Sequence, residues 1–102
     1  MLGYPARTKM NVANSDATVI FGDVSEPGSK LTCGLCRRLE KPWSVNPTTT
    51  DLLELIEWHN VKVLNVAGNR ESKNSGIQER VRRFLVNALR EIQTAKPKEV
   101  VT

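Results

Sequence analysis

The segment at residues 26–38, EPGSKLTCGLCRR, contains two patterns that could carry chemistry. Cys33 and Cys36 have the CxxC spacing of a dithiol redox site or of half a zinc site. Gly28 and Ser29, just before them, have the composition of a turn that opens a helix and binds an anion through backbone N–H groups. The segment therefore predicts either a sulfur site or an anion-binding site.

Both patterns in this segment have a structural alternative, because a Gly-Ser turn before a helix is also what capping requires. Leu31, Leu35 and Leu39 repeat on one face, with Cys36 beside them, so a helix over residues 29–40 with the serine at its start as N-cap would pack the thiols into a core. A redox role through a lowered thiolate pKa is the alternative. One histidine, two cysteines and scattered carboxylates have no ligand spacing beyond this CxxC, so we predict no metal site.

A second polar loop, GNRESKNS at residues 68–75, follows the apolar run VKVLNVA. Gly68 permits close backbone approach, Arg70 offers a bidentate donor to an anion, and Glu71 offers an acceptor to a ribose hydroxyl. A surface salt bridge between the arginine and the glutamate is the alternative. If both loops follow parallel strands, they meet at the carboxyl edge of one sheet, where ligands bind.

The elements that would position these loops alternate along the chain. We expect helices at residues 5–13, 29–40, 48–60 and 76–93, and strands at residues 16–22, 42–45 and 61–67. This alternation predicts a three-layer, Rossmann-like α/β domain over residues 1–93, with a small parallel sheet between helices on both faces. Residues 94–102 read as a flexible tail. Three strands would leave exposed sheet edges, so we expect a homodimer or a higher oligomer.

Three single residues have structural interpretations. His59 ends the third expected helix as a C-terminal cap rather than acting as a catalytic base. Trp43 is expected in the core rather than as a stacking platform for a base. Trp58 belongs to the apolar face of the third helix with the leucines around it.

Composition limits the class of protein. The 102 residues, 39% hydrophobic and 25% charged, suit one globular domain rather than disorder or a coiled coil. No apolar run approaches the ~18 residues of a membrane span, and residues 1–9 lack the layout of a signal peptide, so we place the chain in the cytoplasm with no membrane contact. The net charge of +4 suits a phosphorylated ligand, and aromatic residues at 5% without a stacking motif argue against nucleic acid as the partner.

Several motifs in order along residues 4–89 resemble one family. They are Arg7-Thr8, Asn11-Val12, Ser15-Asp16-Ala17-Thr18, Gly28-Ser29-Lys30-Leu31-Thr32, Lys41-Pro42, and VLNVAGNRESKNSGI at residues 63–77. This pattern resembles the putative molybdenum carrier family, a circularly permuted YpsA-like branch of the SLOG superfamily of Rossmann-like nucleotide-binding proteins. No metal cluster in the sequence supports molybdenum itself.

The resemblance implies a set of ligand-binding residues at one rim of the sheet. They are Gly28, Ser29, Thr32, Gly68, Arg70, Glu71 and Ser72, with Arg7, Asn11 and Asp16 near the same rim. The family's GGQTGVD-like turn does not precede Tyr4, which predicts a short form whose second pocket wall comes from another subunit, or a form with a different ligand.

Three functions follow from these features. The first is binding of a nucleotide or nucleotide-derived phosphorylated metabolite by a sensor, carrier or sequestering module. The alternatives are a phosphoribohydrolase-like enzyme, with Arg70 holding phosphate and Glu71 assisting cleavage, and a protein-interaction module without a small ligand. The sequence predicts no particular cofactor.

Overall fold

The computed structural model describes residues 6–68, 74–91 and 97–101. Helices and strands alternate through these residues. Their bounds are α1 (Ala6–Ala13), β1 (Ala17–Phe21), α2 (Pro27–Arg38), β2 (Trp43–Val45), α3 (Thr49–Trp58), β3 (Val63–Gly68), α4 (Ile77–Glu91) and β4 (Glu99–Val101). Within the described ranges, no helix has the length and apolar character needed to cross a lipid bilayer.

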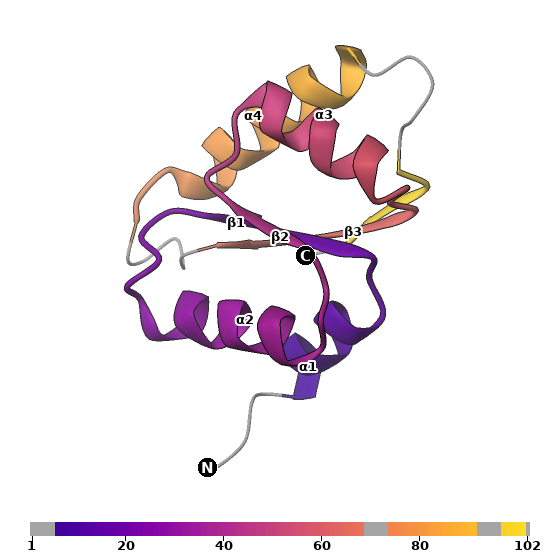
Figure 1. The fold of residues 1–102 in the computed structure, drawn as a ribbon. Coiled ribbons are helices and arrows are strands. Elements are labelled where there is room, and N and C mark those ends of the chain that lie inside the picture. The colour runs from indigo at the N-terminus through magenta and orange to yellow at the C-terminus, as the bar shows by residue number, and fades with distance from the viewer. Residues whose placement is uncertain (1–5, 69–73, 92–96, 102) are drawn as a thin grey trace.

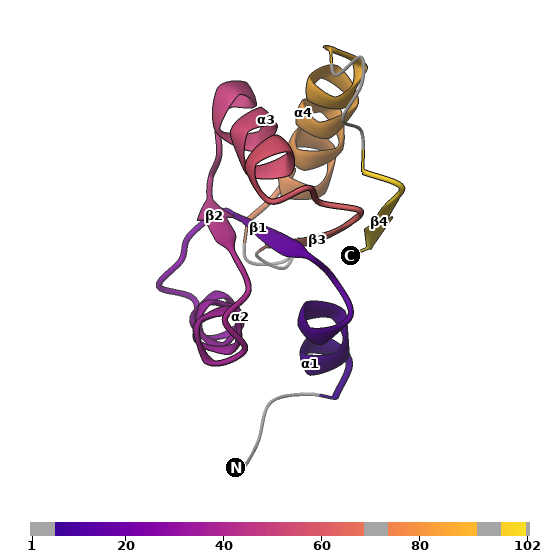
Figure 2. The same ribbon diagram turned by 45° about the vertical axis from the view of Figure 1, so that its right-hand side comes forward.

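The strands form one parallel sheet in the order β2-β1-β3-β4. Helices α1 and α2 lie on one face of this sheet, and α3 and α4 lie on the other (Figures 1 and 2). All five side chains of β1 are buried, as expected of a strand covered on both faces. The predicted α/β fold with a parallel sheet between two helical layers is confirmed.

The connections change direction between β1 and β3. From β1 the chain crosses through α2 to β2, and from β2 it returns through α3 to β3 on the other side of β1. The helices that follow β1 and β3, α2 and α4, therefore lie on opposite faces of the sheet (Figure 2). Phe21 and Gly68 are partners at the carboxyl ends of these two strands. This pair marks the topological switch point, where ligands of open α/β sheets bind.

Two hydrophobic clusters fill the layers. The larger lies between the sheet and the α3 and α4 layer and includes Ala17, Val19, Phe21, Leu52, Leu55, Ile56, Val61, Leu64, Val66, Ile77 and Ala88. The smaller one joins α1 to α2 through Val12, Leu35 and Cys36, with Leu39 packed against it. Alternation along β1 sends successive side chains to opposite layers. The sheet is thus held from both sides, and its carboxyl edge is free to present loops.

The chain after α4 differs from the sequence prediction. β4 pairs in parallel with β3, with Val63 opposite Glu99 and Asn65 opposite Val101, where the sequence pattern predicts a frayed tail and a sheet of three strands. The N–H groups of Lys98 and Glu99 both donate to the carbonyl of Lys62, which fixes the start of this strand. A run of three residues gives no periodicity from which a strand can be read.

The start of α2 also differs from the prediction. Pro27 occupies the first helical position and Glu26 is the N-cap, so Ser29 as N-cap is wrong. Proline suits this position because its fixed φ is already helical and its missing N–H has no partner there. At the end of α3 the prediction is confirmed, because His59 is the C-cap residue.

The sequence predicts two tryptophans in the core, but both are exposed in the structure. Trp43 is 36% exposed because it lies on β2, an edge strand. Trp58, the last residue of α3, is 85% exposed. Helical periodicity cannot tell an exposed residue in the last turn of a helix from the apolar residues that pack on the sheet.

Candidate functional site

A pocket of about 310 Å³ lies at the carboxyl edge of the sheet. Its described lining comes from the ends of β1 and β2 and from the first turns of α4: Phe21, Gly22, Asn46, Pro47, Ile77, Arg80, Val81 and Phe84. The volume is at the lower end of the range found for small-molecule sites. The pocket borders the switch point between β1 and β3, the position at which this fold class binds ligands.

An asparagine side chain forms the polar floor of the pocket. The Asn46 Oδ1 accepts from the N–H of Gly22 at 2.8 Å, and its Nδ2 donates to the carbonyl of Gly22 at 3.0 Å. Asn46 follows β2 with φ at 45°, and Gly22 follows β1 with φ at 99°. Asparagine and glycine are the residues that adopt such left-handed backbone at lowest cost. These two hydrogen bonds link the residues that follow β1 and β2 at the carboxyl edge of the sheet.

Arg80 supplies positive charge to the pocket. Its guanidinium donates to the carbonyl of Ser75 at 3.1 Å and to Oδ1 of Asn74 at 2.7 Å. These contacts span Gly76, whose φ of 82° turns the chain into α4. Among the described lining residues, Arg80 is the charged one. A guanidinium held at a pocket wall with further N–H groups available is suited to a phosphate or carboxylate.

The apolar wall of the pocket is aromatic. The rings of Phe21 and Phe84 meet edge to face, with centroids 5.6 Å apart and planes at 64°. This geometry is favourable for aromatic pairs and ties α4 to the end of β1. The pocket thus combines an aromatic wall, amide groups and one cation.

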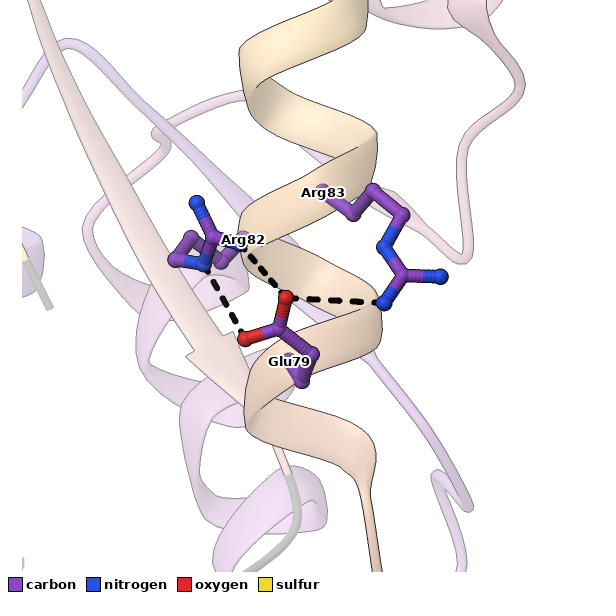
Figure 3. A network of polar contacts seen from close by, with 3 residues as sticks. All are labelled: Glu79, Arg82 and Arg83. Carbon is purple, nitrogen blue, oxygen red and sulfur yellow. Dashed lines mark hydrogen bonds and ion pairs between the residues drawn. The ribbon is translucent and has the colours of Figure 1, made fainter.

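Two other arginines on α4 pair with one glutamate of the same helix. Arg82 makes a two-point contact with the Glu79 carboxylate, and Arg83 reaches the same carboxylate at 3.6 Å (Figure 3). The hydrogen bond from Arg82 lowers the pKa of Glu79. These side chains are exposed, so the pairs contribute little to stability. They do compensate charge on the outer face of α4, which leaves Arg80 as the arginine directed to the pocket.

The predicted glycine loop lies at the start of α2. Gly28 and Ser29 are in its first turn, and a Cβ added at Gly28 would meet no atom within 4 Å. Ser29 is buried, and so is Thr32, whose hydroxyl donates to the carbonyl of Gly28 at 3.0 Å. This part of the predicted site is at the same sheet edge as the pocket, because α2 begins after the carboxyl end of β1. None of the three residues is among those that line the pocket.

The second predicted loop is represented by Gly68 alone. A Cβ added there would lie 3.1 Å from the carbonyl oxygen of Phe21, so the residue allows close approach of the strand ends. Arg70, Glu71 and Ser72 lie outside the described residues. Their contribution to the site therefore stays a prediction.

Asp16 does not share a rim with the other predicted residues. It precedes β1, and its Oδ2 accepts from the N–H groups of Lys62 at 2.8 Å and Val63 at 2.9 Å. These bonds lower its pKa, the one from Val63 most strongly. Asp16 is thus at the amino edge of the sheet, roughly 15 Å along the strand from the carboxyl edge at 3.3 Å per residue. There it joins the starts of β1 and β3.

The remaining two predicted residues, Arg7 and Asn11, lie on α1. Arg7 is exposed in the first turn, and Asn11 is half-buried in the second. Both residues have interaction partners. α1 packs beside α2 on the face of the sheet opposite α4 (Figure 2). They are therefore separated by the sheet from the α4 wall of the pocket.

Comparison with known proteins identifies the family. The model of the circularly permutated YpsA SLOG family matches residues 1–89. The chain belongs to this family. A search of curated proteins found no relative.

One solved structure resembles this SLOG family member over most of its length. The crystal structure is described as a putative molybdenum carrier protein from Syntrophus aciditrophicus. The two have 29% sequence identity and a TM-score of 0.71, over 85% of this chain. The match covers 61% of the other protein, so the SLOG chain spans less than two thirds of its length.

Sequence reasoning missed part of the pocket of this SLOG protein. The sequence pattern gave no site role to Asn46, Arg80 or Phe84, which line the pocket. A signal for Asn46 exists in the sequence, because an asparagine followed by Pro47 directly after a strand is typical of a turn with left-handed backbone. The meeting of β2 with α4 at one edge depends on the strand order, which the sequence pattern did not supply.

The CxxC thiols of the SLOG chain are inside helix α2 rather than at its N-terminus. Cys36 is fully buried, and burial raises its pKa, with a hydrogen bond to Thr18 acting in the opposite direction. Cys33 is half-buried. The interpretation of Cys36 as core packing is confirmed, because it belongs to the smaller hydrophobic cluster. Among the described residues, no three His, Cys, Asp or Glu side chains come together in a way that could hold a metal ion.

Proposed function

We propose that this SLOG family member binds a nucleotide or a nucleotide-derived phosphorylated metabolite at the carboxyl edge of its sheet. Arg80 pairs with a phosphate, the second N–H of the Asn46 side-chain amide donates to the polar part of the ligand, and Phe84 packs against its apolar part. Binding of this kind suits a sensor, a carrier or a sequestering module.

The observation that supports the proposal most is the composition of the pocket. A single fixed guanidinium, a pair of amide groups and an aromatic wall border one cavity at the switch point of the sheet. Phosphorylated ligands need this combination, because the charged end must be paired and the rest must be removed from water. The start of α2, with backbone N–H groups at the positive end of its dipole, adds to the positive potential of the same edge.

The predicted residues of the second loop complete the proposed site. Gly68 ends β3 beside Phe21, so the segment that follows begins at the switch point. Arg70, Glu71 and Ser72 come next in the chain, and we propose that Arg70 adds a second cation for the phosphate. The name of the related crystal structure mentions molybdenum. We do not propose molybdenum as the cargo or cofactor of this chain.

The alternative functions remain distinguishable from this proposal. A phosphoribohydrolase-like activity would depend on Glu71 as the carboxylate, and a module without a small ligand would depend on its surfaces alone. Glu71, on which the enzyme would depend, lies outside the described residues. Both are outcomes of the experiment below.

The test is isothermal titration calorimetry with AMP, cyclic AMP, NAD and ADP-ribose on wild type, Arg80→Gln and Arg90→Gln. Arg90 is exposed near the other end of α4 and gives the same change of charge away from the pocket. Loss of a charge-assisted contact costs about 1.5–3 kcal/mol, so Arg80→Gln should weaken binding about 10- to 100-fold. Arg90→Gln should bind as the wild type does.

Two results contradict the proposal. One is the absence of heat with every compound in the panel. The other is equal affinity of all three proteins, which would move the phosphate away from Arg80. Chromatography of the ligand after incubation reports hydrolysis, and turnover lost in Glu71→Gln would favour the enzyme over pure binding.

A further inference from the structure

β2 forms the edge of the sheet opposite β4, and an acidic groove lies beside it. β2 pairs with β1 on one side and with no described strand on the other. A groove of about 580 Å³ runs between this edge and the outer face of α3. Its described lining is Trp43, Ser44, Asp51, Glu54, Leu55, Glu57, Trp58 and His59. The groove shares none of the described lining residues of the carboxyl-edge pocket.

The backbone of β2 points hydrogen-bonding groups out of the sheet. The Thr18 N–H donates to the carbonyl of Pro42, and the Asn46 N–H donates to the carbonyl of Ile20. In a parallel sheet, the backbone N–H and C=O groups of successive residues in a strand point alternately to the strand on one side and to the other side. Residues 42, 44 and 46 therefore face β1, and the N–H and C=O groups of Trp43 and Val45 face outward. An edge of this kind accepts a further strand.

Large apolar side chains stand exposed around the same edge. Trp58 is 85% exposed, and Trp43 and Val45 are more than a third exposed. The Arg37 guanidinium carbon lies 5.8 Å from the centre of the Trp43 ring, so this indole already contacts a cation from its own chain. Exposed tryptophans beside a groove are typical of binding surfaces, since each offers a large apolar area and an affinity for cations.

The charge of the groove is opposite to that of the whole chain. Asp51, Glu54 and Glu57 contribute carboxylates, and no lysine or arginine is among its described lining residues, although the net charge is +4. A second copy of the chain docking by the same edge across a two-fold axis would bring two sets of carboxylates together. Like charges brought together cost several kcal/mol at an interface. Complementarity therefore favours a partner that carries positive charge.

We propose that the β2 edge and the α3 groove bind an extended peptide segment rich in lysine or arginine. The segment adds as a strand to β2 and pairs with the outward groups of Trp43 and Val45. Its basic side chains on one face reach Glu54 and Glu57 and contact Trp58. Backbone pairing supplies affinity without sequence preference, and the carboxylates and the indole select basic side chains.

Fluorescence polarisation with two labelled heptapeptides tests this. The probes are Val-Arg-Val-Lys-Val-Arg-Val and its counterpart Val-Glu-Val-Asp-Val-Glu-Val. We expect the basic peptide to bind in a saturable manner and the acidic one not to bind. The double variant Glu54→Gln/Glu57→Gln should weaken the basic peptide about tenfold or more. A matched control, Glu26→Gln/Glu99→Gln, makes the same charge change elsewhere and should bind as the wild type does.

A backbone variant separates strand addition from simple charge attraction. Val45→Pro removes an outward N–H and leaves every bond from β2 to β1 in place, and proline is tolerated on edge strands for this reason. It should weaken the basic peptide at least about fivefold with an unchanged circular dichroism spectrum. Should that variant unfold, Trp58→Ala, at an exposed position, is expected to weaken binding by a similar factor.

Three outcomes would overturn the proposal. They are no binding of the basic peptide, equal binding by the wild type and the Glu54→Gln/Glu57→Gln variant, and light scattering that shows a dimer which Val45→Pro dissociates. The last would assign the edge to a second copy. None of these outcomes bears on the carboxyl-edge pocket, which Arg80→Gln tests separately.

Discussion

The side-chain amide of Asn46 forms a reciprocal pair of hydrogen bonds with the backbone of Gly22, at 2.8 and 3.0 Å. The two residues are 24 positions apart and follow different strands, so this pair fixes the carboxyl ends of β1 and β2 relative to each other. Both have positive φ. The geometry of the proposed binding pocket depends on this pair, because Asn46 and Gly22 both line the pocket.

Replacing Asn46 should destabilise the fold. Asn46→Ala removes two hydrogen bonds, each worth about 1 kcal/mol. It also places alanine, which tolerates positive φ poorly, at this position, and this costs about 1 kcal/mol more. The expected loss in the free energy of unfolding is therefore about 2–3 kcal/mol by urea titration. Asn46→Gly removes the bonds but permits the backbone, so it should lose less than Asn46→Ala. Equal stability of all three proteins would show that the hydrogen bonds between Asn46 and Gly22 add nothing to the free energy of unfolding.

The lowered pKa of Asp16 makes the amino edge of the sheet sensitive to acid. Its charged form accepts hydrogen bonds from Val63 and Lys62, so the folded-state pKa lies below the unfolded value. The stabilisation is present above the unfolded pKa, about 4, and is lost as the pH falls through the folded pKa. Asp16→Asn should unfold more easily than the wild type at neutral pH, by about 1 kcal/mol. This difference should shrink in strong acid, and a constant difference from neutral to acid pH would contradict the assignment.

The N-terminus of α3 is held by a capping box. The Asp51 N–H donates to Oγ1 of Thr48 at 3.1 Å, and the Thr48 N–H donates to Oδ2 of Asp51 at 3.0 Å. Thr48→Ala should lower the free energy of unfolding by about 1 kcal/mol. Thr50→Ala, at an exposed position in the same turn, is the matched control and should change it little. Similar losses in the two variants would mean that the effect is not capping.

The two thiols should differ in reactivity. Burial raises the pKa of Cys36 and excludes reagent, whereas Cys33 is half-buried. Thiolates are the reactive form, so Ellman's reagent should modify one cysteine readily in the native wild type and the second after unfolding. Cys33→Ser should remove the fast phase, and Cys36→Ser should keep it. A fast phase that persists in Cys33→Ser would revive the redox interpretation of the CxxC motif.

The sequence predicted the layers of the fold because each layer has a periodic signature. Alternation of helices and strands indicated a parallel sheet, and the apolar run of β3 indicated burial on both faces. Helix α2 began earlier than predicted because Pro27 at its first position outweighs a serine cap further along. β4 and the exposed Trp58 could not be read, since pairing with β3 and the direction of a last helical turn depend on tertiary contacts.

The candidate site was predictable only in part. That it lies where parallel strands end follows from the fold class, and Gly68 at the end of β3 agrees with this. Asp16 was grouped with it through family resemblance, although a residue that precedes a strand must lie at the other edge. Asn46 and Phe84 were not recognised, because they reach the pocket from β2 and α4 through the strand order.

Binding at the carboxyl-edge pocket is tested most directly by NMR titration of ¹⁵N-labelled protein with AMP, NAD and ADP-ribose in turn, each to about 1 mM. Our account predicts that at least one of the three shifts the Gly22 amide, the Asn46 side-chain amide and the Arg80 Nε–H together. It also predicts that Arg80→Gln raises the ligand concentration needed to shift the Gly22 and Asn46 signals about 10- to 100-fold, with Arg90→Gln behaving as the wild type does. The account is contradicted if no compound shifts these signals, or if the shifts fall on the α3 groove instead.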